Sequence, residues 1–117
     1  MNKADRKAFS EMTSEDLIRS VTRNLLETLI AKNRDYGATA VRNPLLAPGL
    51  SATTAILVRM SDKVMRLQNL LSGNKAVVKE SLSDTVLDLA GYAILWECAR
   101  LREEACAGDL VQEREGN

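Results

Sequence analysis

Apolar residues recur at helical spacing along most of the chain, whereas the strict alternation of a half-buried strand is hard to find. Three segments carry this spacing, and we expect helices over about residues 13–34, 52–71 and 78–105. In the first segment the apolar residues from Leu17 to Ile30 lie one, three or four positions apart, which forms an amphipathic stripe. The pattern therefore predicts an all-α fold with three main helices per protomer.

Local signals mark the ends of these helices. Thr13 and Asp16 match a short-acid form of the capping box at the start of the first helix, and Gly37 is a plausible left-handed terminator. Ser51 is placed to cap the second helix, and the run Ser72-Gly73-Asn74 is expected to end it. The short link that follows makes the second and third helices antiparallel neighbours.

The third helix is apolar on more than one face. Its apolar residues are Val86, Leu87, Leu89, Ala90, Ala93, Ile94, Leu95, Trp96, Cys98 and Leu101. Such a helix is either central in its bundle or part of an interface between copies. Three helices cover it poorly, so we expect a homo-oligomer, a dimer or larger, that completes the helical bundle.

The remaining segments differ in character. Residues 1–12 are expected to form a polar N-terminal arm, and residues 108–117 a mobile tail, around a single helical domain at residues 13–107. Residues 38–50 hold both prolines and form a loop that is long for a helix–helix connection. Long ordered loops are often functional, so this one is a candidate lid or neighbour contact.

Composition narrows the chemistry. The 117 residues hold sixteen Lys plus Arg, sixteen Asp plus Glu and no histidine, so the formal net charge is zero. The absence of histidine excludes the serine triad, histidine-ligated zinc and an imidazole base, and the charge balance does not predict binding to extended nucleic acid. Cys98 and Cys106 are eight residues apart on one predicted helix, roughly 12 Å, which is too far for a disulfide. With no apolar run that spans a membrane and no apolar core of a signal peptide in Met1–Glu11, we expect a cytoplasmic protein.

Three polar clusters stand out from the amphipathic background. The end of the first helix carries Lys32, Asp35, Tyr36 and Gly37. The second helix carries Arg59, Asp62, Lys63 and Arg66, whose offsets of three, four and seven keep them within an arc of roughly 100°. The third helix carries Glu80, Asp84 and Asp88, which form one acidic stripe.

The acidic stripe has two interpretations. Like charges four residues apart repel, and a divalent cation such as Mg²⁺ would relieve that repulsion. Ion pairing with Arg59, Lys63 and Arg66 on the neighbouring helix would relieve it equally well, and this structural reading is somewhat favoured by spacing alone. For the basic cluster, a solvated face and a phosphate contact are equally supported. Lys32, Asp35 and Tyr36 fit an ordinary helix end, or a pocket in which Tyr36 stacks on a base.

These clusters together resemble a known family. The strings Lys32-Asn-Arg-Asp35-Tyr36-Gly37, Arg59-Met-Ser-Asp62-Lys63-Val-Met-Arg66-Leu67 and Glu80-Ser-Leu-Ser-Asp84-Thr-Val-Leu-Asp88-Leu-Ala-Gly-Tyr92 occur in this order. They are similar to the three blocks of the small phage and bacterial "nucleotide modification associated domain" family, the first of that name. The resemblance spans roughly residues 32–92 and implies a role in phage or bacterial nucleotide metabolism.

A more distant resemblance is to the all-α nucleotide pyrophosphatases of the MazG and dimeric dUTPase type. Those proteins hold Mg²⁺ through acidic pairs on two helices and cleave between the α and β phosphates of nucleoside triphosphates. The segment Glu80 to Asp84 resembles one of their acidic pairs, with Ser81 in place of the second glutamate. Where the other pair is expected, this chain has Arg59 and Asp62.

Three functions remain open at this point. A Mg²⁺-dependent nucleotide pyrophosphohydrolase would use Asp62, Glu80 and Asp84 as catalytic residues and the same three with Asp88 as metal ligands. A non-catalytic oligomer would instead sequester a nucleotide, for example a signalling nucleotide in phage anti-defence. Either would bind its ligand through a set that we expect to comprise Lys32, Asp35, Tyr36, Arg59, Lys63, Arg66 and Tyr92. The third possibility is a helical adaptor without a ligand.

Overall fold

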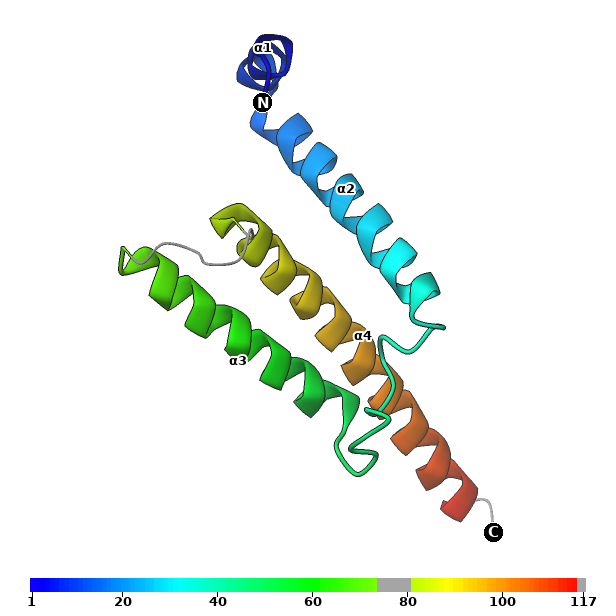
Figure 1. The fold of residues 1–117 in the computed structure, drawn as a ribbon. Helices are drawn as coiled ribbons and strands as arrows, with labels where there is room; N and C mark the ends of the chain where they lie inside the picture. The colour runs from blue at the N-terminus through cyan, green and yellow to red at the C-terminus, as the bar shows by residue number, and fades with distance from the viewer. Residues whose placement is uncertain (74–80, 116–117) are drawn as a thin grey trace. The chain divides into compact units, whose positions relative to one another are not determined.

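The computed structural model describes the backbone of residues 1–73 and 81–115 and the side chains of residues 1–73 and 81–108. Over these residues the chain is entirely helical, without a strand (Figure 1). The four helices are α1 (Lys3–Glu11), α2 (Ser14–Asp35), α3 (Ala52–Leu71) and α4 (Leu82–Glu115). The all-α fold predicted from the sequence is therefore confirmed. None of the described helices is long and apolar enough to cross a membrane.

Residues Met1–Asp35 form one compact unit. The sequence predicts a single helical domain that begins at residue 13. This unit holds α1 and α2, and neither helix has a buried residue. The segment expected to be an arm is helical because the Asn2 side chain accepts a hydrogen bond from the Asp5 backbone N–H (2.8 Å) and caps α1. The Thr13 hydroxyl accepts from the Asp16 backbone N–H (3.1 Å) in the same way at the start of α2.

Residues Tyr36–Asn117 form the second unit, which is built on α3 and α4. Residues early in α3 contact residues late in α4, and residues late in α3 contact residues early in α4, so the two helices are antiparallel. The core of the pair is a small cluster formed by Ala52, Ile56 and Ala99. The half-buried side chains packed around it are Val41, Met60, Tyr92, Leu95 and Trp96. Small residues at the centre allow the helices to approach closely at this end.

Helix α3 has the bounds that the hydrophobic spacing predicts. The Ser51 hydroxyl accepts a hydrogen bond from the Thr54 backbone N–H (3.1 Å), and the chain leaves the helix at Gly73 with a positive φ of 89°. Helix α4 is longer than predicted, because it continues past residue 105 to Glu115 through much of the expected tail. The predicted start of this helix at residue 78 lies outside the described residues.

The segment between α2 and α3 follows a series of turns. Gly37 ends the preceding helix in the left-handed region, with a φ of 68°, and Ala38 shares that conformation. Further along, the Asn43 side-chain amide donates to the Pro48 carbonyl (3.0 Å) and holds the two sides of the loop together. This hydrogen bond and the turn at Gly37 define the loop at residues 38–50, the segment singled out in the sequence.

Candidate functional site

An ion pair joins two of the sequence blocks across the contact surface between α3 and α4, which we call the seam. Lys63 Nζ lies 3.0 Å from Asp88 Oδ2, and the two side chains are 23% and 30% exposed. Lys63 is held on the face of α3 that also carries Ala52 and Ile56, because these positions follow the helical period. The seam is therefore apolar at the Ile56 end and charged at the Lys63 end.

The other members of the basic cluster flank this pair along α3. Arg66 lies one turn further on and is half-buried, with its Nε atom out of contact with solvent. Arg59 and Asp62 lie on the same side of α3 as Lys63 and Arg66, and both are exposed. Two guanidinium groups thus neighbour a half-buried ammonium group, an arrangement suited to an anion with several charged oxygens.

The acidic stripe of α4 is divided between two structural roles. The Asp84 carboxylate accepts a hydrogen bond from the Ser81 backbone N–H (3.1 Å), and the Ser81 hydroxyl accepts one from the Asp84 backbone N–H (3.0 Å). This reciprocal pair is a capping box at the start of α4. Asp88, one turn later, makes the ion pair with Lys63. Glu80, expected as a catalytic residue and metal ligand, lies outside the described residues.

The predicted metal ligands are accordingly not gathered into one cluster as far as the structure describes them. Within residues 1–73 and 81–108, no group of three or more acidic or cysteine side chains is arranged to hold a metal ion. Asp62 lies on the exposed side of α3, while Asp84 and Asp88 are engaged as described above.

The other residues predicted to bind a ligand lie on different elements of the chain. Lys32 and Asp35 are exposed in the last turn of α2, and Tyr36 follows with 72% of its surface accessible. Tyr92 is half-buried and packs against the Ala52–Ile56–Ala99 cluster, one turn of α4 beyond Asp88. Tyr92 thus contributes to the seam of the helix pair, whereas Tyr36 is accessible to a ligand or partner.

Sequence reasoning missed the contact that closes the other end of the seam. Glu103 of α4 accepts two hydrogen bonds from Thr53, one from the backbone N–H (3.2 Å) and one from the hydroxyl (2.9 Å). Its carboxylate therefore lies at the N-terminus of α3, where unpaired N–H groups favour a negative charge. The two residues are 50 positions apart, so no local sequence pattern indicates the contact.

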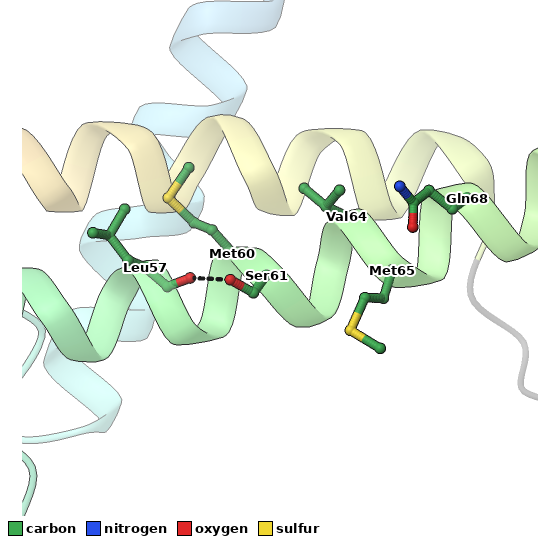
Figure 2. A pocket seen from close by; sticks show the side chains of 6 residues that line it. All are labelled: Leu57, Met60, Ser61, Val64, Met65 and Gln68. Carbon is green, nitrogen blue, oxygen red and sulfur yellow. Dashed lines mark hydrogen bonds between the residues drawn. The ribbon is translucent and has the colours of Figure 1, made fainter.

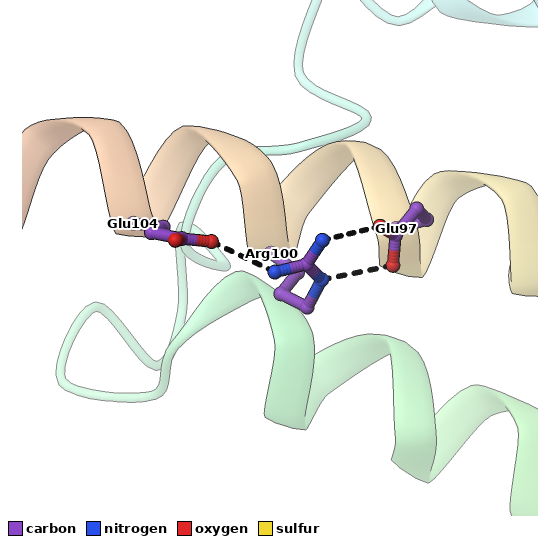
Figure 3. A network of polar contacts seen from close by, with 3 residues as sticks. All are labelled: Glu97, Arg100 and Glu104. Atoms are coloured by element: carbon purple, nitrogen blue, oxygen red, sulfur yellow. Dashed lines mark hydrogen bonds and ion pairs between the residues drawn. The ribbon is translucent and has the colours of Figure 1, made fainter.

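A second charged network lies on the exposed surface of α4. Arg100 pairs with Glu97 and Glu104, one turn away on either side (Figure 3). The side-chain hydrogen bond from Arg100 lowers the pKa of Glu97 below its ordinary value, and the same contact raises the pKa of the guanidinium. All three residues belong to one helix, so the network supports α4 locally.

Comparison with protein families gives one clear result. The family model described as "Nucleotide modification associated domain 1" matches residues 32–97, which is more than half of the 117-residue chain. The match spans all three sequence blocks and includes the Lys63–Asp88 pair. Neither the curated proteins nor the solved structures contain a match to this chain. The chain therefore belongs to the nucleotide modification associated domain 1 family, whose description links it to nucleotide metabolism.

Proposed function

We propose that this protein binds a nucleotide through its phosphate groups at the charged end of the α3–α4 seam. One observation carries the proposal: a half-buried lysine–aspartate pair joins two blocks of a nucleotide-associated family, with Arg59 and Arg66 beside it on α3. Arginine presents a planar donor fork that matches phosphate oxygens, and lysine adds a point charge. These three cations are the proposed phosphate ligands.

The partial burial of the pair strengthens a phosphate contact at this position. Lys63 and Arg66 are shielded from bulk water, and a shielded cation interacts with an anion more strongly than an exposed one. Asp88 holds Lys63 in place in the absence of ligand, and a phosphate group competes with Asp88 for the ammonium. Tyr36, exposed at the start of the same unit, is a candidate for contact with the base.

The second candidate function is Mg²⁺-dependent hydrolysis of the bound nucleotide. The observation that favours it is the regular acidic spacing on α4, where Asp84 and Asp88 lie one turn apart. Both carboxylates already have partners, so a metal would have to displace Ser81 or Lys63 from them. Binding without chemistry requires no such exchange, and for this reason we place it first. Sequestration of a signalling nucleotide would be one form of it.

A ligand panel tests both functions in one experiment. The full-length protein is incubated with dNTPs, NTPs, cyclic dinucleotides and NAD derivatives, with and without Mg²⁺. Thermal shift reports binding, because stabilisation grows with ligand concentration relative to Kd. Chromatography of the same samples reports conversion. Binding with intact ligand supports sequestration, and Mg²⁺-dependent release of pyrophosphate supports hydrolysis. The absence of any shift and of any product would refute both.

A matched pair of variants locates the site. Lys63→Met removes the central ammonium group and keeps the length of the side chain. It should weaken binding by about 1.5–3 kcal/mol, the typical contribution of a charge-assisted hydrogen bond. Arg23→Gln removes one positive charge from an exposed position on α2, outside the family blocks, and should leave the affinity unchanged. Equal losses in both variants would indicate a general charge effect and contradict the assigned site.

A further inference from the structure

Helix α3 carries an open apolar groove beside the face that packs against α4, and Met60 borders both. The groove has a volume of about 560 Å³ and is lined by Leu57, Met60, Ser61, Val64, Met65 and Gln68. All six side chains come from α3 at spacings of one, three or four residues, so they form one continuous stripe (Figure 2). Leu57, Val64 and Met65 are 50%, 43% and 65% exposed, which is unusual for a contiguous apolar surface.

The apolar surface of α3 extends beyond the residues that pack against α4. Toward α4 the helix presents Ala52 and Ile56 at one end and the half-buried Lys63 at the other. The groove lies roughly a third of a turn around the helix from these residues. Burial of apolar surface drives packing, so an open apolar groove of this kind is a packing surface.

The described chain does not hold enough helices to cover all of its apolar surface. Helix α4 has a second open apolar stripe on the side away from α3, formed by Val86, Leu87, Ile94 and Leu101. Against these two open stripes, the described residues offer a single further long amphipathic helix, α2, since α1 is nine residues long and mostly polar. At least one stripe is therefore left for another molecule.

The charges beside the two stripes indicate which stripe forms the contact and which molecule covers it. The groove on α3 is lined without a single charged side chain, and its two polar residues, Ser61 and Gln68, are neutral. Two copies can therefore meet there face to face without like-charge repulsion. The outer surface of α4 carries Glu97 and Glu104 around one arginine, and a symmetric contact there would bring these acids together. We propose that the α3 groove is the surface through which two copies of this chain form a two-fold dimer.

This dimer has a consequence for the charged seam. The lining of the groove includes neither Lys63 nor Asp88, so we expect each copy to keep its own Lys63–Asp88 pair. The proposal does not depend on nucleotide binding, since its test measures only the association of the two copies.

The association is measured on the full-length protein by sedimentation velocity over a range of concentrations. We expect a reversible dimer, and Met65→Lys should raise its dissociation constant about tenfold or more, since it places two like charges in the contact. Ala107→Lys adds the same charge at an exposed position of α4 outside both stripes and should leave the dimer unchanged. A monomeric wild-type protein, or a dimer that Met65→Lys does not weaken, would overturn the proposal.

Cross-linking provides a second measurement that does not depend on destabilising the contact. Ser61 lies near the middle of the stripe, where a two-fold axis brings a residue close to its own copy. In a Cys98→Ser, Cys106→Ser background, Ser61→Cys should form a covalent dimer with a short bismaleimide. Ala107→Cys in the same background should not. Equal cross-linking at both positions, or none at Cys-substituted Ser61, contradicts a contact through the groove.

Discussion

The Lys63–Asp88 pair should contribute measurably to stability, and a double-mutant cycle isolates that contribution. At 3.0 Å and an effective dielectric constant of about 20, the direct attraction is about 5.5 kcal/mol. Most of it is offset by the removal of both groups from water, because the side chains are only 23% and 30% exposed. We expect a net coupling energy of about 1 kcal/mol, at the upper end of the range for exposed pairs.

The assay is urea unfolding of wild type, Lys63→Met, Asp88→Asn and the double variant. The matched control is the same cycle on Arg19 and Glu15, which are 2.7 Å apart on α2 but 62% and 73% exposed. That pair should give about 0.3–0.5 kcal/mol, as is typical of pairs four residues apart on a helix. A coupling for Lys63–Asp88 no larger than the control would refute the claim that the charged seam is a packed part of the structure.

Three further predictions concern single residues of the second unit. Asp84→Ala should cost about 1 kcal/mol in urea unfolding because the Ser81 N–H loses its acceptor, and an unchanged unfolding midpoint would contradict the capping box. Glu103→Ala should cost about 1–3 kcal/mol by removing both acceptors of Thr53, with Glu104→Ala on the exposed surface as the milder comparison; equal losses would argue against a special role for Glu103. Glu97→Gln should destabilise the protein at neutral pH but not at low pH, because the hydrogen bond from Arg100 lowers the pKa of Glu97 in the folded state. The charged carboxylate contributes stability above its ordinary pKa, and this contribution is lost as the pH falls through the folded-state pKa. A difference from wild type that is independent of pH would contradict this prediction.

Much of the helical framework follows from the sequence. The spacing from Ala55 to Leu71, together with the cap at Ser51, is sufficient to define α3, because each signal is local. The continuation of α4 through Gly108 was not predicted, since a glycine costs about 1 kcal/mol in a helix and usually signals an end. Ion pairs one turn apart, such as Arg100–Glu104, stabilise the helix just before that point.

The candidate site was predictable only in part. The contact between Lys63 and Asp88 could be expected from the sequence, because antiparallel neighbouring helices with complementary charges bring such residues together. The roles of individual acids could not be assigned, since the same spacing serves a metal site, an ion pair or a helix cap. Asp84 shows the ambiguity most clearly: the pattern of serine followed three residues later by an acid is a capping signal as well as part of a family block.

The assignment of nucleotide phosphates to the charged seam is tested most directly by NMR. Uniformly ¹⁵N-labelled full-length protein is titrated with pyrophosphate and with dATP, and backbone amide shifts are followed residue by residue. We predict saturable shifts centred on Arg59 to Arg66 and on the residues of α4 around Asp88, and their loss in Lys63→Met. Shifts confined to other residues, or no saturable shift with either compound, would contradict the assignment.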